Sequence, residues 1–158
     1  MLVVVREAFT AACCKGYVRR IDDTLAKVDS PGLNYARILP ALSDTVEAIL
    51  RRNQFLCKVH QVWYLTRYQP GHGLGKHQDG TISVPSGRSF ASVLIYLNHD
   101  FDRGRLHIVS SCDASQDDAM ISLTPRSGTL VVVGAALWHM AEPPVNGCKY
   151  LLRGDCAV

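Results

Sequence analysis

The chain has 158 residues, of which 47% are hydrophobic and 20% are charged. This composition fits one globular domain with a buried core and excludes a disordered chain. The net charge of +3 comes from 17 basic and 14 acidic residues, an excess too small to indicate a nucleic-acid-binding face.

Six cysteines occur without any Cys-x-x-Cys spacing, and the apolar content is high enough to fold without disulfides. We therefore expect free thiols and a location in the cytosol or nucleus. The apolar residues 1–5 are followed at once by Arg6 and Glu7, so this run is too short to span a membrane. No membrane partner is expected, and the sequence does not indicate an oligomeric state.

The first predicted elements are a short strand and a helix. Residues 3–5 are three valines, which favour a strand. Apolar side chains recur every three or four residues over residues 10–28, which predicts a helix with Thr10 as its N-cap. Ser30, Pro31 and Gly32 then predict a break.

A second helical region is predicted over residues 35–52. Ser43, which follows Pro40, is a candidate N-cap inside it. Val46, Ile49 and Leu50 would supply its apolar face.

The remaining two thirds of the chain favour short strands separated by turns. A glycine-rich turn at residues 70–75 follows the first of them. The predicted strands are residues 58–69, 90–98, 105–109, 119–123, 129–133 and 148–157. This spacing predicts a mainly β fold with N-terminal helices, of the cupin-like jelly roll (double-stranded β-helix) type. We expect one domain over residues 1–158, with residues 1–56 as mainly helical support and residues 57–158 as the β-roll.

A candidate metal site comes from His77, Asp79 and His139. Side chains two residues apart on a strand point the same way, so His77 and Asp79 can reach one ion. His139 follows a predicted strand and could complete the set from a neighbour. Two imidazoles and one carboxylate leave open positions and suit iron(II). The plain structural alternative is a buried His139 bonded to a backbone carbonyl and a polar loop histidine at position 77.

Three segments around these residues resemble the prolyl 4-hydroxylase-like branch of the Fe(II)/2-oxoglutarate-dependent dioxygenases. The first runs from Arg67-Tyr68 through Gly71 to His77-Gln78-Asp79. The second is the strand at residues 92–98 followed by residues 101–106, and the third runs from residue 128 through His139 to residue 155. The resemblance covers residues 58–157 with its motifs in the family's order.

The resemblance implies an oxygenase that uses iron(II), 2-oxoglutarate and dioxygen, with ascorbate as an optional addition. It places the co-substrate lysine at Lys149, ten residues after His139, and it implies contacts from Tyr68 and Ser92. Arg153 is the alternative partner for the far carboxylate of 2-oxoglutarate, and an Arg153–Asp155 pair is an equally simple structural interpretation. No catalytic residue beyond the metal ligands is implied.

The chain departs from the family pattern at two places. Residues 103–105 are Arg-Gly-Arg where the family has Gly-Gly-Glu, and Leu74 replaces an aromatic residue. We expect both the Arg-Gly-Arg segment and Leu74 to lie near the substrate entrance.

The polar loops at residues 80–89 and 110–118 favour an extended peptide or protein substrate, hydroxylated on a prolyl or other residue. A free amino acid or metabolite is the alternative substrate. Two other classes of function remain open at this stage: a non-catalytic, cupin-like metal-binding module and an adaptor domain without a metal.

Overall fold

The computed structural model describes residues 1–27, 33–85 and 87–158. The large antiparallel sheet has the order β1 (Leu2–Val5), β11 (Leu130–Gly134), β7 (Gly87–Tyr96), β14 (Lys149–Ala157), β4 (Val62–Tyr68), β2 (Leu33–Ile38), with β3 (Lys58–Val59) beside β14 and β6 (Ser83–Val84) beside β7. The small sheet has the order β10 (Ile121–Leu123), β9 (Leu106–Ile108), β12 (His139–Ala141), β5 (Leu74–His77). A separate pair joins β8 (Asp102–Arg103) to β13 (Pro144–Val145).

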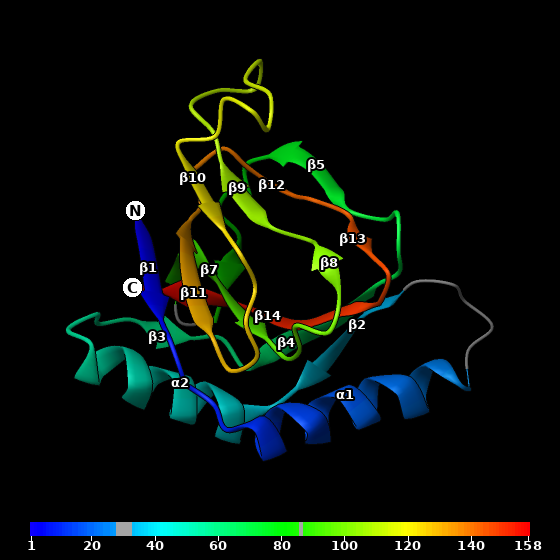
Figure 1. Ribbon diagram of the computed structural model, residues 1–158. Helices are drawn as coiled ribbons and strands as arrows, with labels where there is room; N and C mark the ends of the chain where they lie inside the picture. The colour runs from blue at the N-terminus through cyan, green and yellow to red at the C-terminus, as the bar shows by residue number, and fades with distance from the viewer. Residues whose placement is uncertain (28–32, 86) are drawn as a thin grey trace.

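The helices α1 (Ala11–Leu25) and α2 (Pro40–Arg52) lie across one face of the large sheet, and the small sheet lies over the other face (Figure 1). Alternate residues of the central strands therefore enter two different cores. Leu130 and Val132 of β11 pack in the cluster beneath the helices, whereas Val131 and Val133 pack in the smaller cluster between the sheets. The fold is thus mainly β with N-terminal helices, as predicted.

The predicted first strand and first helix are confirmed. The Thr10 hydroxyl accepts a hydrogen bond from the backbone N–H of Cys13 at 3.3 Å, and the helix ends with Ala26 as its C-cap. The predicted end at residue 28 and the break at residues 30–32 lie outside the described residues. No helix in the described part of the chain has the length and apolar character that crossing a membrane requires.

The predicted second helix is wrong at its beginning. Residues 35–38 belong to β2, which pairs with β4 along its whole length, so pairing with the sheet overrides the local pattern. The helix begins at Pro40, whose fixed φ angle suits the first helical position, and Leu39 is the N-cap without a side-chain hydrogen bond. Ser43 is therefore not the cap.

Most of the other predicted strands are confirmed, with shifted ends. The run at residues 58–69 divides into β3 and β4. The prediction missed β5, β6, β8, β12 and β13, which have two to four residues each, because so short a segment carries no readable alternation. Two of these missed strands, β5 and β12, carry two of the three candidate metal ligands, His77 and His139.

Ser43 joins α2 to the large sheet through a buried hydrogen-bond relay. Its hydroxyl accepts from Trp63 Nε1 at 3.0 Å and donates to the carbonyl of His60 at 2.9 Å. Ser43 is 2% exposed and Trp63 is fully buried. We expect Ser43→Ala to lower the free energy of unfolding by about 1–3 kcal/mol, because it leaves a buried indole N–H without an acceptor.

Urea unfolding followed by tryptophan fluorescence measures this change. Thr45→Ala is the control, because the Thr45 hydroxyl is exposed and bonds only within the same helix, to the carbonyl of Ala41. Equal losses in the two variants would contradict the role of the relay.

Candidate metal centre and its cavity

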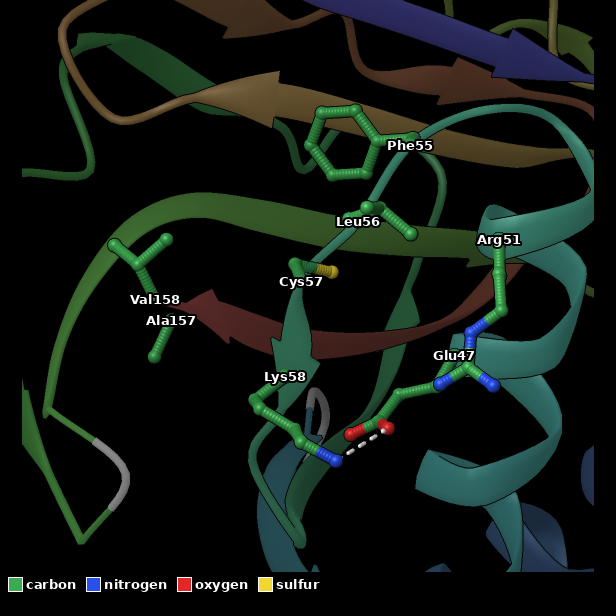
Figure 2. A pocket seen from close by; sticks show the side chains of 8 residues that line it. All are labelled: Glu47, Arg51, Phe55, Leu56, Cys57, Lys58, Ala157 and Val158. Atoms are coloured by element: carbon green, nitrogen blue, oxygen red, sulfur yellow. Dashed lines mark hydrogen bonds and ion pairs between the residues drawn. The ribbon is translucent and has the colours of Figure 1, made fainter.

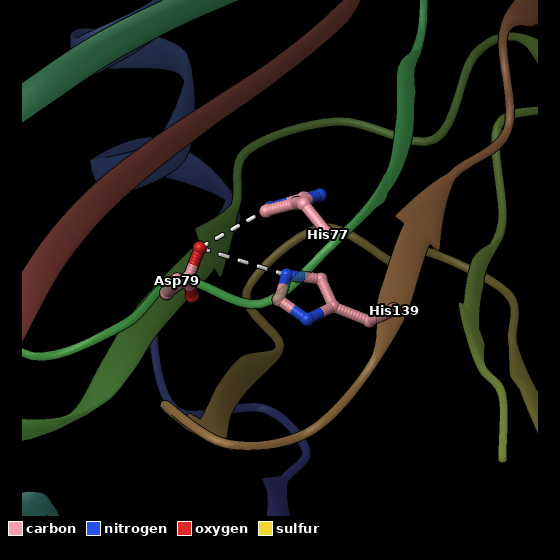
Figure 3. Close-up of side chains that lie close together, drawn as sticks. All are labelled: His77, Asp79 and His139. Atoms are coloured by element: carbon pink, nitrogen blue, oxygen red, sulfur yellow. Dashed lines mark ion pairs between the residues drawn. The ribbon is translucent and has the colours of Figure 1, made fainter. Parts of the chain in front are cut away.

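The side chains of the three candidate ligands, His77, Asp79 and His139, lie close together. They are at the edge of the small sheet, at one end of a cavity between the two sheets. The pairing of β5 with β12 sets His77 directly opposite His139, and Asp79 follows β5 by two residues. Asp79 Oδ1 lies 3.2 Å from His77 Nε2 and 3.7 Å from His139 Nε2 (Figure 3). The three ligand atoms lie within 4.8 Å of one another, and no other such cluster of His, Cys, Asp or Glu occurs in the described ranges.

Backbone carbonyls orient both imidazole rings. His77 Nδ1 lies 2.8 Å from the carbonyl oxygen of Gly75, and His139 Nδ1 lies 2.9 Å from that of Leu137. A carbonyl oxygen can only accept, so each Nδ1 carries the proton and donates. In the neutral rings the Nε2 lone pairs are left free on the side facing Asp79, as in many protein metal sites.

The charges of the three groups favour an ionised carboxylate beside two imidazoles. Burial opposes ionisation of Asp79, but hydrogen bonds from His77 and Ser92 and the nearby Arg153 hold its pKa below the usual range. The hydrogen bond to Asp79 raises the pKa of His77, whereas burial lowers the pKa of His139. A cation bound by the three side chains would take the place of the proton shared by His77 and Asp79.

A cavity of about 320 Å³ extends from these residues between the two sheets. Side chains of β14 line one wall, namely Lys149, Leu151 and Arg153, because alternate residues of a strand point to the same face. The rest of the lining is Asn34, Thr66, Tyr68, Leu74, His77, Gln78, Asp79, Leu94, Tyr96, Leu106, His139 and Ala141.

Lys149 supplies a buried positive charge to this cavity. The residue is 1% exposed, and its Nζ donates to the carbonyl of Gly104 at 3.1 Å. The ammonium also lies 4.8 Å from the ring centroid of Tyr68, which is its partner across the β14–β4 pairing. Burial lowers the pKa of Lys149 to about 8, against the opposing effect of Glu142. A lysine has three N–H donors, so this group can also bind an anionic ligand.

Arg153 and Ser92 lie at the end of the cavity near Asp79. Arg153 Nη2 is 3.3 Å from Asp155 Oδ1, 4.0 Å from Asp79 Oδ1 and 3.2 Å from Ser92 Oγ. The Arg153–Asp155 pair that the sequence allowed is therefore formed, and the arginine already has carboxylate partners. Ser92 is buried behind Asp79 and is not among the residues lining the cavity.

A second charged cluster, not predicted from the sequence, lies beside Lys149. Glu142 is 1% exposed and bonds to both Arg103 and Arg105, while His107 Nε2 lies 3.9 Å away. Hydrogen bonds from Arg105 lower the pKa of Glu142 to about 2. The sequence did contain a sign of this cluster, namely the Arg-Gly-Arg departure from the family pattern and a single glutamate three residues after His139.

Another hollow, of about 300 Å³, lies between α2 and β3, away from these residues (Figure 2). Its charged contact is the ion pair of Lys58 Nζ with Glu47 Oε2 at 3.2 Å, which joins the helix to the strand. Cys57 also lines it, and its Sγ lies 3.0 Å from that of Cys156, both as free thiols. The lining residues of this hollow, as far as the structure describes them, include no set of side chains able to bind a metal.

Comparison with known proteins gives a family and a fold. A sequence profile of the 2OG-Fe(II) oxygenase superfamily matches residues 63–154, more than half of the chain. No curated protein matches the chain in sequence.

Three solved structures illustrate the structural similarity. A viral collagen prolyl hydroxylase from Paramecium Bursaria Chlorella virus-1, in complex with 2OG, is 15% identical with a TM-score of 0.72, covering 99% of this chain and 96% of its own. A prolyl hydroxylase from Trichoplax adhaerens, bound to a hypoxia-inducible factor peptide, is 12% identical with a TM-score of 0.71, covering 98% and 82%. The carbocyclase SnoK from nogalamycin biosynthesis is 14% identical with a TM-score of 0.72, covering 98% and 78%. At these identities, the similarity establishes the fold alone.

Burial of the Lys149 ammonium is expected to lower the free energy of unfolding by a measurable amount. Because its pKa falls to about 8 from the ordinary 10.5, the unfolded chain binds more protons than the folded chain between these pH values. The unfolding free energy contributed by this residue therefore rises with pH across that window. We expect Lys149→Met to raise the unfolding free energy by about 2 kcal/mol at pH 7, and to lose this advantage as the pH approaches 10.5.

Chemical denaturation at a series of pH values, without added ligand, measures the difference between variant and parent. Lys58→Met is the control, because it makes the same substitution at a lysine whose side chain is 67% exposed. A Lys149→Met variant less stable than the parent at pH 7 would show that the ammonium is stabilising.

Proposed function

Because the chain belongs to the 2OG-Fe(II) oxygenase superfamily, we propose that His77, Asp79 and His139 are its iron(II) ligands and that it hydroxylates a C–H bond of its substrate. The protein is a 2-oxoglutarate-dependent oxygenase and uses iron(II), 2-oxoglutarate and dioxygen. An enzyme of this family is neither a non-catalytic metal-binding module nor a metal-free adaptor. What is proposed is the role of individual residues and the class of substrate.

The observation that carries the proposal is that the Nε2 atoms of His77 and His139 both lie close to one carboxylate oxygen of Asp79. Two nitrogen donors and one oxygen donor on one side suit iron(II) and leave room on the other side for 2-oxoglutarate and dioxygen. The rings need no rotation to bind, because the carbonyls of Gly75 and Leu137 already hold them.

Lys149 is proposed to bind the far carboxylate of 2-oxoglutarate. It lines the same cavity as the three ligands, it is fully desolvated, and its contacts are a neutral carbonyl and a tyrosine ring. Arg153 is less suitable, because Asp155 and Asp79 already balance its charge. Tyr68 is proposed to face the co-substrate from β4, beside Lys149 on the same sheet, and Ser92 to support Asp79 and Arg153 from behind the cavity.

The two facing sheets are proposed to form a double-stranded β-helix within a single domain. The small sheet covers the cavity face of the large sheet, so the site lies inside the roll. The first 56 residues contribute more than helices to this domain, since β1 and β2 both join the large sheet.

The side chains of this protein contribute to the reaction by orienting the co-substrate and by excluding water. When bound, iron(II) with 2-oxoglutarate and dioxygen supplies an oxidation that yields succinate and carbon dioxide and leaves one oxygen atom on the substrate. Lys149 fixes the orientation of the co-substrate by an ion pair in a site of low dielectric constant. Leu94, Leu106 and Leu151 give the cavity apolar walls that exclude water from the reacting groups.

A peptide or protein is the proposed substrate, with a prolyl residue as the first candidate. The cavity is lined from both β2, through Asn34, and β5, through Leu74. Each of these strands is the last in its sheet among the described residues, and an unpaired strand edge can receive an extended peptide. The two prolyl hydroxylases of similar fold agree with this choice.

A small molecule is the second candidate substrate. The fold is equally similar to SnoK, a carbocyclase of nogalamycin biosynthesis, and a cavity of about 320 Å³ has room for a compact ligand. Leu74, at 47% exposure, leaves an apolar surface at the rim that either kind of substrate could contact.

Iron binding tests the ligand assignment. We expect the protein, mixed with iron(II) and 2-oxoglutarate under nitrogen, to develop a weak visible charge-transfer band, and His77→Ala to lose it. His99→Ala is the matched control, because His99 is exposed and its Nδ1 accepts from the backbone N–H of Ser127 outside the cavity. A full band in His77→Ala would exclude this residue as a ligand.

The substrate class is tested by mass spectrometry. We expect proline-containing peptides to gain one oxygen atom only in the presence of iron(II), 2-oxoglutarate and dioxygen, with succinate formed in equal amount. A peptide library and a panel of free amino acids are compared with the parent protein and Asp79→Ala. Turnover of the amino acids without turnover of any peptide would contradict the peptide proposal and favour the small-molecule class.

A further inference from the structure

Glu142 is a buried carboxylate held by two arginines, immediately after β12. Its Oε1 accepts from Arg103 Nε at 2.9 Å and from Arg105 Nη2 at 2.9 Å, and its Oε2 accepts from Arg105 Nε at 2.8 Å. The backbone N–H of Arg105 also donates to Oε2 at 3.2 Å, and the backbone N–H of Glu142 donates to the carbonyl of Arg105 at 2.8 Å. One side chain thus fixes both ends of a three-residue turn.

The turn that Glu142 holds has an unusual backbone. Arg103 has a φ of 61° and Gly104 a φ of 66°, so two consecutive residues occupy the left-handed region. A Cβ at position 104 would lie 2.6 Å from the ring of Phe101, which makes glycine necessary there. An arginine rarely adopts this conformation unaided, so contacts elsewhere must stabilise it, and the carboxylate of Glu142 supplies them.

The carbonyl in the middle of this turn is the one that Lys149 contacts. Gly104 O accepts from Lys149 Nζ at 3.1 Å, and Lys149 Cδ lies 3.5 Å from the position of a Cβ on Gly104. Glu142 therefore reaches the cavity cation through two links, the arginines and the Gly104 carbonyl. Its negative charge also opposes the effect of burial on the pKa of Lys149. The nearby His107 adds no charge in its neutral form, which burial favours by lowering its pKa.

We propose that Glu142 is a positioning residue for 2-oxoglutarate: by holding the Arg103–Gly104–Arg105 turn, it sets the Lys149 ammonium at the end of the cavity where the far carboxylate binds. The inference rests on the proposed function, because it takes Lys149 as the co-substrate cation. It also explains the Arg-Gly-Arg departure. The two arginines bind a glutamate from the neighbouring segment instead of facing the substrate.

The test compares two ligands that differ only in the far carboxylate. 2-Oxoglutarate and 2-oxopentanoate have five carbons and the same metal-binding end, but 2-oxopentanoate ends in a methyl group. In Glu142→Gln, an amide NH₂ group replaces an acceptor facing an arginine, so the turn is released. We expect the Kd of 2-oxoglutarate for the Mn(II)-loaded protein to rise about tenfold, with the Kd values of 2-oxopentanoate and Mn(II) changed less than about twofold.

Two further variants keep the test decisive. Arg105→Gln removes from the exposed side the two hydrogen bonds that the Arg105 guanidinium donates to Glu142, so it should repeat the selective loss if Glu142→Gln does not fold. Glu47→Gln is the control, because Glu47 is an ion-paired carboxylate on α2, away from the cavity, and should leave every Kd unchanged. Thermal unfolding of each variant verifies that the compared proteins are folded.

The outcomes separate this inference from the proposed function. Unchanged 2-oxoglutarate binding in folded Glu142→Gln and Arg105→Gln overturns the inference alone. An equal loss of 2-oxoglutarate and 2-oxopentanoate also overturns it, because that result shows a general structural role. If the parent protein binds 2-oxoglutarate no more tightly than 2-oxopentanoate, the assignment of Lys149 under the proposed function fails as well.

Discussion

The antiparallel pairing of β5 with β12 is the contact on which the rest of the site depends. It sets His77 opposite His139 and brings the turn carrying Asp79 to the same point. The strands approach closely where β5 begins, because a Cβ on Gly73 would collide with the carbonyl oxygen of Ala141. β12 is in turn held on its other edge by β9, so the small sheet fixes the positions of the two histidines of the proposed ligand set.

The fold and the candidate site differ in how far the sequence predicts them. The large strands were readable because β7 and β14 are long, with 10 and 9 residues, and because β11 has three consecutive valines. The His-x-Asp triplet was readable because it is local. The start of the second helical region was misjudged because residues 35–38 pair with β4, which lies some thirty residues further along the chain.

The electrostatic partners of the site could not be predicted in the same way. Arg103 and Arg105 are recognisable as a departure from a family pattern, but their partner Glu142 lies 37 residues beyond Arg105. Only the folded arrangement of β8, β12 and β13 brings them together. Likewise, the choice between Lys149 and Arg153 depends on which cation already forms ion pairs with carboxylates among the described residues, and this is a property of packing and not of spacing.

Backbone carbonyl groups hold side chains in place at both ends of the cavity. Backbone carbonyls orient the two histidine rings at one end, and a backbone carbonyl holds the lysine ammonium at the other. The backbone of a sheet or of a clamped turn moves less than a long side chain, so the separation between the proposed metal ligands and the Lys149 ammonium is set by the fold itself. A dicarboxylate of fixed length can be recognised only if that separation is fixed. The cost of desolvating Lys149 and Glu142 is consistent with a site in which precise placement of charge matters more than maximal stability.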